Sequence, residues 1–317
     1  MTSNWVNSKS GSRPNPDADA LDPLHGVDFS KLERSLHRPR TFMSLMFTVI
    51  VSAMTLFALI PLFSVLWLLV LRGGRKLSLA ALTQLPPAPL EQSGGFGNAI
   101  VGTLAICGMA LLISLPIGLL SAIFLAQARP ENRLASSVRF AGKVLTGFPS
   151  ILAGVFAYGV VVMATGGYSA LAGAVALSIL MLPTILLTSE DAIRMVPDRM
   201  KEAAIGMGAT DTQVVWMVLL PTAVPRILTG VMLAIARGAG ETAPLLFTAL
   251  FSNYWLLWNG QIKVMQPTAS LAVLIYNFAG MPFANQVELA WAAALVLVIM
   301  VLIANIIGQS LASRQIQ

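Results

Sequence analysis

Residues 198–221 read DRMKEAAIGMGATDTQVVWMVLLP, and this stretch lies between two long segments that carry almost no charge. Asp198 precedes a run of helix-forming residues, and Gly208 is a residue type that commonly ends a helix. Thr210 or Asp211 can cap a second helix directly after it. The pattern predicts a helix–glycine turn–helix elbow suited to docking on a partner. An ordinary pair of interfacial helices would have the same spacing.

Long uncharged runs flank the elbow on both sides. Charged residues make up 11% of the 317-residue chain and hydrophobic residues 56%, whereas an average soluble domain carries about 25% charged residues. These values exclude a disordered chain and argue against a soluble enzyme. A membrane span needs about 20 apolar residues, so the uncharged stretch 144–189 must contain two helices, divided at Gly166-Gly167.

We expect an all-α polytopic membrane protein with six transmembrane helices, at about residues 42–71, 98–126, 146–165, 168–188, 227–250 and 289–311.

The segments between these spans have expectations of their own. Residues 1–40 hold four prolines and eleven of the 34 charged residues, which predicts a disordered cytoplasmic tail ahead of a permease domain at 41–317. The segment 190–226 is expected to form a cytoplasmic loop, in which two prolines at 221 and 225 end the second helix of the elbow. The apolar patch 271–278 is too short to span and predicts an interfacial or re-entrant helix.

The basic residues predict the orientation of the chain. With the N-terminus inside, fifteen Lys and Arg lie in cytoplasmic segments and four lie outside. The excess of Lys and Arg on one side places both termini in the cytoplasm. The net charge of +6 therefore reflects membrane orientation rather than nucleic-acid binding. The outer cluster Arg72, Arg75 and Lys76 runs against the rule.

Arg237 and Glu241 lie inside the expected fifth span, where an ionised group costs several kcal/mol. They are four residues apart on a helix, so they share a face and can pair. In one interpretation, this ion pair only fixes helix packing. In the other, the guanidinium of Arg237 binds a tetrahedral oxyanion through two of its oxygens, and Glu241 keeps the anion from being trapped.

The sequence offers no catalytic or metal site. Its two histidines, His25 and His37, lie in the tail, and Cys107 is its single cysteine. The sequence contains no Gly-x4-Gly-Lys-(Ser/Thr) motif of P-loop ATPases. We therefore expect no cofactor and no ATPase activity in this chain.

The order Glu-Ala-Ala-x3-Gly-x9-Val-x-Leu-Pro at residues 202–221 resembles the EAA loop of ABC-importer permeases. This resemblance implies a type I ABC importer permease fold with a cytoplasmic coupling helix, which seats in a separate ATP-hydrolysing subunit. Glu202 and Gly208 are the first positions that the resemblance carries over. Ala203 and Ala204 would allow close helix approach, and Asp211 would meet the ATPase. The implied coupling residues are Glu202, Ala203, Ala204, Gly208 and Asp211.

The string AIARGAGETAPLLFTA at residues 234–249 closely resembles the A-type permeases of phosphate ABC importers. Shorter agreements extend the resemblance over about residues 45–310: Glu91 with Gly94-Gly95, Pro149-Ser150-Ile151 with Gly154, and Gln266-Pro267. It implies that Arg237, Glu241 and Thr242 lie on the path of the solute. The chain departs from the pattern at Leu187, where relatives often have Arg.

The resemblance also implies a function and a set of partners. The chain would be the permease subunit that moves inorganic phosphate across the bacterial inner membrane by alternating access. It would pair with a homologous second permease, a dimer of ATP-binding subunits holding ATP and Mg, and a periplasmic phosphate-binding protein. Two alternatives stay open: a permease for sulfate, molybdate or phosphonate, and a membrane subunit that signals phosphate status without carrying flux.

Overall fold

The computed structural model describes residues 39–129, 131–258 and 261–314. The predicted tail at residues 1–40 therefore lies outside the described residues, except for its last two. The chain divides into two units, residues 1–63 and residues 64–317. Helix α1 (Pro39–Lys76) passes from the first unit into the second, and every other described element belongs to the second.

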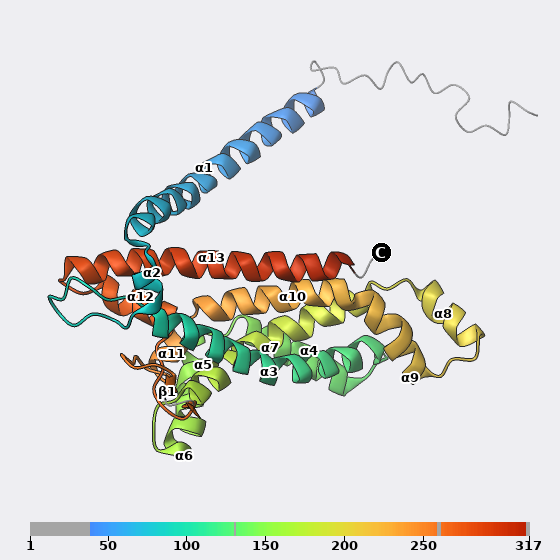
Figure 1. Cartoon of the computed structure of the whole chain (residues 1–317). Helices are drawn as coiled ribbons and strands as arrows, with labels where there is room; N and C mark the ends of the chain where they lie inside the picture. Colours follow the sequence, from blue (N-terminus) through green and yellow to red (C-terminus); the bar gives the residue numbers. More distant parts are fainter. Residues whose placement is uncertain (1–38, 130, 259–260, 315–317) are drawn as a thin grey trace, which may run out of the picture. The chain divides into compact units, whose positions relative to one another are not determined.

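The second unit is built almost entirely from helices (Figure 1). After α1 the helices are α2 (Leu79–Thr83), α3 (Gly97–Gln127), α4 (Arg133–Thr146), α5 (Ser150–Ala157), α6 (Met163–Thr165), α7 (Ala170–Arg194), α8 (Asp198–Gly206), α9 (Asp211–Val214), α10 (Leu220–Gly240), α11 (Ala243–Leu246), α12 (Leu271–Ala279) and α13 (Ala284–Arg314). Two π-helical turns join neighbouring helices, η2 (Tyr158–Val162) and η3 (Val215–Leu219). Two short strands, β1 (Leu257–Trp258) and β2 (Gln261–Ile262), pair antiparallel, with Leu257 opposite Ile262.

Within the described residues, five helices are long and apolar enough to cross a membrane, which makes the chain a multi-pass membrane protein. They are Phe42–Lys76, Gly97–Gln127, Ala170–Arg194, Asp211–Gly240 and Ala284–Ala312. Among these residues a sixth span is found if the pair Arg133–Thr146 and Ser150–Thr165, bent by 106°, is counted as one. The span expected at 146–165 falls on the second helix of this pair, and the bend lies at its start. Gly147 and Pro149 fall between the two helices, and proline cannot donate the hydrogen bond that would continue the first.

The elbow also differs from its prediction at its C-terminal end. We expected Pro221 and Pro225 to end the second helix, but the helix runs without a break from Asp211 to Gly240. Its wide π-helical turn, η3, ends just before the two prolines. A proline ring clashes with the carbonyl one turn earlier, and a widened turn is one way in which a helix accommodates it.

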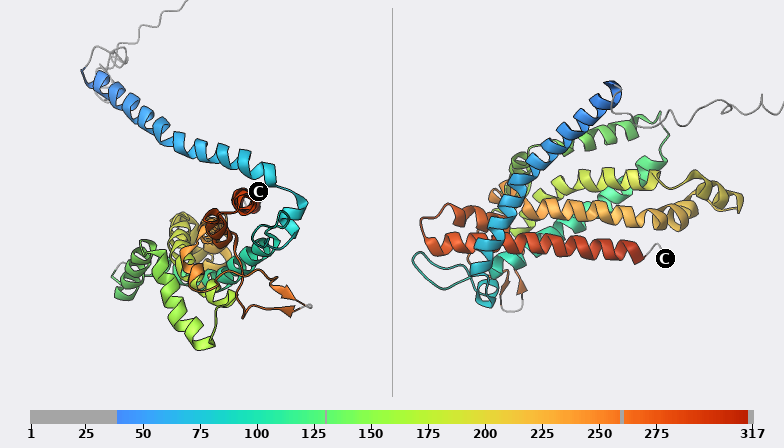
Figure 2. Two further views of the ribbon diagram at one scale, coloured as in Figure 1. Left: turned by 90° about the vertical axis from the view of Figure 1, so that its left-hand side faces the viewer. Right: turned by 90° about the horizontal axis from the view of Figure 1, so that it is seen from above.

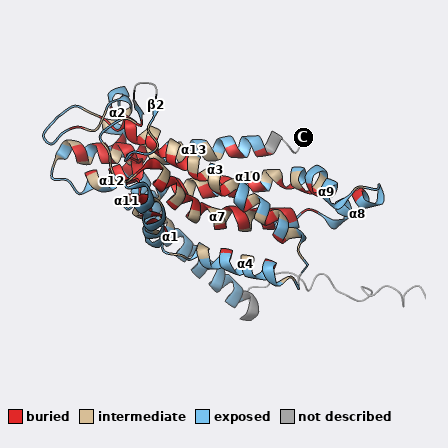
Figure 3. Cartoon of the chain, turned by 90° about the horizontal axis from the view of Figure 1, so that it is seen from below, coloured by how far each residue is buried: buried red, intermediate tan, exposed pale blue. Residues whose placement is uncertain are grey.

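Helix α7 is the centre of the bundle and packs against α3, α10, α4 and α5, while α10 also packs against α13 (Figure 2). Its first half is rich in alanine and glycine, and small residues let membrane helices approach closely. The larger side chains Leu177, Met181 and Ile185 are at most 1% exposed. Figure 3 shows this burial concentrated on α7 and on the helix faces turned toward it.

The two ends of the bundle carry different elements. The elbow α8–α9 projects at one end, and the β1–β2 hairpin, α11 and α12 lie at the other (Figures 1 and 2). Helix α12 forms where the apolar patch 271–278 predicted it, and Thr103 Oγ1 of α3 accepts a hydrogen bond from the Leu271 N–H at 2.8 Å. Leu271 and Leu274 are fully buried, so one face of α12 packs into the bundle, whereas Tyr276 on the same helix is 62% exposed.

Two glycines of α3 differ in the space around them, so an added methyl group should affect the stability of the protein in opposite directions. A Cβ on Gly102 would collide with the backbone oxygen of Ala269, whereas a Cβ on Gly108 meets nothing within 4 Å. We expect Gly102→Ala to destabilise the protein by about 2 kcal/mol through overpacking. Gly108→Ala should be neutral or stabilising by up to about 1 kcal/mol, since alanine favours a helix. Thermal unfolding of both variants in detergent checks this, and equal melting temperatures would contradict the close approach of α3 to residue 269.

Candidate functional site

The elbow is held in shape by local interactions that its sequence specifies. Gly208 has φ +88°, a left-handed conformation that glycine adopts without strain, and it turns the chain between α8 and α9. Thr210 then caps α9 in a capping box, in which its hydroxyl accepts from the Gln213 N–H and the Gln213 side chain accepts from the Thr210 N–H. The predicted helix–glycine turn–helix elbow is confirmed.

Four of the five predicted coupling residues are exposed on this elbow. Glu202, Ala203, Gly208 and Asp211 all face outward, whereas Ala204 is only 4% exposed. Ala204 belongs to the same buried apolar cluster as Val214 of α9, and its carbonyl accepts from the Ala209 N–H at 3.0 Å. Of the two alanines expected to allow close helix approach, only Ala204 does so within this chain.

The elbow and the turn η3 after it also carry exposed apolar side chains, which we call the apolar patch. It consists of five side chains that are 42–84% exposed: Met200, Ile205, Met207, Trp216 and Met217. Charged residues at positions 198, 199, 201 and 202 lie on the same elbow. An exposed patch of Met and Trp rimmed by charges is typical of a protein-binding surface, because Met adapts its shape to a partner.

A single helix joins the elbow to the second predicted site. The helix Asp211–Gly240 has 30 residues, and at 1.5 Å per residue it is about 45 Å long. It begins at the elbow and ends one residue before Glu241, where the backbone is extended (φ −74°, ψ 126°). Thr242 then precedes the short helix α11, so residues 241–242 form a break in the helical backbone.

Arg237 and Glu241 meet at this break. Arg237 Nε lies 3.6 Å from Glu241 Oε1, and the two side chains are 35% and 18% exposed. The ion pair predicted from their spacing is present, but Glu241 lies just past the end of the helix rather than within it. Thr242 follows directly and is also partly buried. The structure thus brings all three predicted path residues together.

Close backbone packing fixes the position of the break. A Cβ on Gly154 of α5 would lie 2.6 Å from Pro244 Cα, just after the break. On the other side, a Cβ on Gly238 would lie 3.1 Å from the sulfur of Met181 in α7. Non-helical backbone at membrane depth is tolerated only where protein buries it or where it lines a water-filled cavity.

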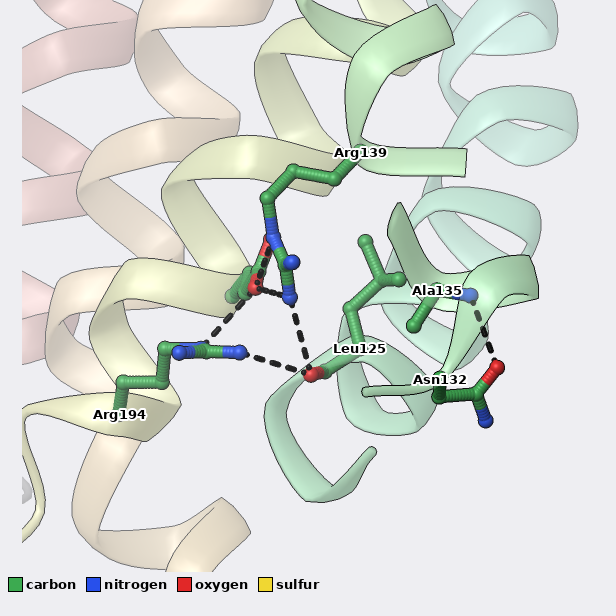
Figure 4. A network of polar contacts seen from close by, with 6 residues as sticks. Leu125, Asn132, Ala135, Arg139 and Arg194 are labelled. Carbon is green, nitrogen blue, oxygen red and sulfur yellow. Dashed lines mark hydrogen bonds and ion pairs between the residues drawn. The ribbon is translucent and has the colours of Figure 1, made fainter. Parts of the chain in front are cut away.

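A buried ionic cluster joins α7 to α3 and α4 just ahead of the elbow (Figure 4). Glu190, with its side chain 4% exposed, accepts hydrogen bonds from Arg139 Nε at 2.9 Å and Arg139 Nη2 at 2.7 Å, and Arg194 Nε lies 3.0 Å from it. Both arginines also donate to the carbonyl of Leu125 near the end of α3, at 3.4 and 3.1 Å. The cluster ties three helices together at the last turn of α7, directly before the loop that leads to α8.

The comparisons with known proteins agree with this geometry. Residues 114–317 match the family model described as "Binding-protein-dependent transport system inner membrane component". The "Phosphate transport system permease protein PstA" of Haemophilus influenzae is 41% identical over 251 residues, covering 78% of this chain and 87% of that protein. The chain belongs to the PstA permease family.

Further relatives and solved structures support this membership. The PstA protein of Yersinia pestis is 37% identical over 84% of this permease and 89% of its own length. A crystal structure of a bacterial alginate ABC transporter superposes with a TM-score of 0.61, covering 88% of this permease and 98% of that chain at 16% identity. An inward-facing MetNI methionine ABC transporter matches with a TM-score of 0.58, 69% and 95% coverage and 20% identity. The two structures show that the fold is that of an ABC-importer permease.

Sequence reasoning on this permease missed the Glu190 cluster. A signal was present, since Glu190 ends the third long uncharged run and Arg194 follows it by one helical turn, a spacing that favours pairing. Arg139 could not be found in this way, because it comes from a helix 51 residues earlier. Leu187, the position at which the chain was expected to depart from the family pattern, has its side chain facing α4: a Cβ on Gly142 would lie 3.6 Å from Leu187 Cδ2.

The Glu190 cluster gives a stability prediction for this permease. Glu190→Gln removes the carboxylate that pairs with two guanidinium groups, and breaking a buried ion pair costs about 3 kcal/mol. Because Arg194 is half exposed, most of this cost comes from Arg139. We expect the apparent melting temperature in detergent to fall by several degrees. Asp191→Asn, one residue further on and exposed, is the control and should leave it unchanged. Equal melting temperatures for the two variants would exclude a stabilising role for the cluster.

Proposed function

We propose that this chain is the membrane-spanning permease subunit of an ATP-driven importer that carries inorganic phosphate across the bacterial inner membrane. The observation that carries the proposal is the unbroken helix Asp211–Gly240, which has the elbow at one end and the Arg237–Glu241 pair at the other. Membership in the PstA family and the names of its relatives support phosphate as the solute.

The proposed mechanism is alternating access, driven from the elbow. An ATP-binding subunit seats the elbow through Glu202, Gly208 and Asp211 and through the apolar patch of Met200, Ile205, Met207, Trp216 and Met217. When ATP closes the ATPase dimer, the elbow moves, and α9 and α10 move with it as one rigid element about 45 Å long. A displacement of the cytoplasmic end of this helix therefore also moves the break at residues 241–242.

At the break, Arg237 would meet the phosphate. A guanidinium matches two oxygens of a tetrahedral oxyanion, and at partial exposure its charge is only weakly screened by water. Glu241 balances the charge of Arg237, so that the anion can leave again. Its carboxylate can also accept a hydrogen bond from a protonated oxyanion, which phosphate offers at neutral pH and sulfate does not. The hydroxyl of Thr242 adds a neutral donor beside them.

In the proposed assembly, other subunits supply the functions that this chain does not perform. ATP and Mg are bound by a dimer of separate ATPase subunits, a homologous permease completes the solute path, and a periplasmic phosphate-binding protein delivers the solute. In this proposal both termini lie in the cytoplasm, with the elbow on the same side.

The test is ATP-dependent uptake into proteoliposomes that contain this chain, its sister permease, the ATPase and the binding protein. We expect uptake of labelled phosphate that excess unlabelled phosphate abolishes and that excess sulfate or molybdate leaves unchanged. Uptake that sulfate or molybdate abolishes would make the chain a permease for another oxyanion. ATP hydrolysis without any solute movement would instead support the signalling role.

A further inference from the structure

The basic cluster Arg72, Arg75 and Lys76 lines a cavity of about 480 Å³ at the end of α1. The opposite wall is the start of α13, with Glu288 and Trp291, and the segment just before it. These three basic residues run against the positive-inside rule. The structure brings all three together at one concave site.

The side chains of this cavity are arranged by specific contacts. Arg72 Cζ lies 5.2 Å from the centre of the Trp291 ring, which is within the range of a cation–π interaction. Lys76 Nζ lies 3.2 Å from Glu288 Oε2. A Cβ on Gly73 would lie 2.6 Å from the backbone oxygen of Trp291, so α1 and α13 meet here at close range. The cavity is part of the packed end of two helices.

The positive charge of the site is only partly balanced. Among the residues that the structure describes, the ion pairs within this cavity use one carboxylate, Glu288, and it pairs with Lys76. Arg72 and Arg75 are exposed at the cavity, and no described carboxylate lies within ion-pair distance of either. The site holds three cations against one anion and is suited to a further negative group.

The position of the site along the helices identifies its environment. The uncharged run of α1 ends at Leu71, and the uncharged run of α13 begins at Leu289. Both apolar runs thus end at this cavity, so its charges lie where the hydrocarbon of the bilayer gives way to headgroups. Trp291 is the residue type that concentrates at this level.

We propose that this cavity binds the phosphodiester headgroup of an anionic phospholipid. Arg72 and Arg75 bind the phosphate oxygens, as guanidinium groups bind anions in pockets between membrane helices. Four apolar residues cover the glycerol and the first methylene groups of the lipid: Met281, Pro282, Ala284 and Val287. This apolar lining favours a lipid over free inorganic phosphate, which has no carbon to bury. The proposal is independent of the solute that the permease carries.

Native mass spectrometry of the assembled complex, titrated in detergent with phosphatidylglycerol or phosphatidylcholine, tests the proposal. We expect the complex to retain phosphatidylglycerol in preference to phosphatidylcholine. Each basic residue near an anionic headgroup contributes enough that removing two, in Arg72→Gln/Arg75→Gln, should weaken retention roughly thirtyfold. The matched control is Arg129→Gln/Arg133→Gln, two exposed arginines near the start of α4, which should behave as wild type.

A second variant keeps the test decisive if the double variant assembles poorly. Glu288→Gln releases Lys76 from its ion pair and adds no bulk, so it should strengthen retention of phosphatidylglycerol severalfold. Equal retention of both lipids, or equal loss in the control double variant, would overturn the proposal. Inorganic phosphate that displaces phosphatidylglycerol at millimolar concentration would assign the cavity to the free anion. Loss of binding-protein capture in the double variant, with lipid retention unchanged, would assign it to an acidic protein surface.

Discussion

Replacing Arg237 by Gln is expected to lower phosphate uptake about ten- to hundredfold while ATP turnover of the assembled complex falls far less. Arg237 is the one basic residue between Arg226 and Lys263 in the sequence, and a hydrogen bond to a charged group contributes about 1.5–3 kcal/mol. Gln keeps a polar hydrogen-bond donor on a shorter side chain but cannot neutralise an anion. The measurement is uptake of labelled phosphate into proteoliposomes, with ATP hydrolysis followed in the same samples.

Two further variants separate a solute-binding role of Arg237 from a packing role. Glu241→Gln leaves Arg237 unpaired, so a packing role predicts a loss of stability as large as that in Arg237→Gln. A solute-binding role predicts instead that Glu241→Gln binds phosphate but releases it slowly. Arg133→Gln, an exposed arginine of α4, is the control for the loss of one positive charge. Normal uptake by the Arg237→Gln variant would mean that the ion pair serves only helix packing.

Replacing Gly208 by Val is expected to abolish uptake while the chain still inserts into the membrane. Gly208 has φ +88°, and a β-branched side chain in a left-handed conformation costs at least about 1–2 kcal/mol. A Cβ at this position meets no atom within 4 Å, so the damage comes from the turn itself and not from a clash inside the bundle. The turn between α8 and α9 would open, and the elbow could no longer seat in the ATPase.

The elbow contains its own controls for this prediction. Gly206, two residues earlier, lies in α8 with no atom within 4 Å of an added Cβ, so Gly206→Ala should transport normally. Gly208→Asn should recover part of the activity, because asparagine tolerates the left-handed conformation. Glu202→Lys reverses an exposed charge without changing the turn, and it should abolish uptake by weakening ATPase binding. Co-purification of the ATPase with each variant measures this directly, and unimpaired assembly and transport in Gly208→Val and Glu202→Lys would remove the coupling role of the elbow.

The elbow and the Arg237–Glu241 pair were predicted from local sequence for the same reason. A helix stop at Gly208, a cap at Thr210 and a pairing distance of four residues all depend on neighbours within a single turn. The membrane class followed from composition alone, because 11% charged residues cannot cover a water-exposed surface. The motif spacing then led to the family.

Other features depended on contacts between distant residues, and local sequence could not supply them. Local rules predict that Pro221 and Pro225 end the helix. The helix instead continues past both prolines to Gly240, after the widened turn η3. The chain also turns by 106° between Arg133–Thr146 and Ser150–Thr165, at the point where the expected third span begins, and the uncharged run does not show this turn.

The sequence by itself determined the membrane class, the turn of the elbow and the ion pair beside the break, because each depends on composition or on residues within one helical turn. Only the tertiary structure decided which partners the remaining charges take. Glu190 meets Arg139 across 51 residues, and the cations at 72–76 meet Glu288 and Trp291 across more than 200. Burial favours pairing only for Glu190, whose side chain is 4% exposed. In both places, the partner that a charge meets depends on which helices pack side by side.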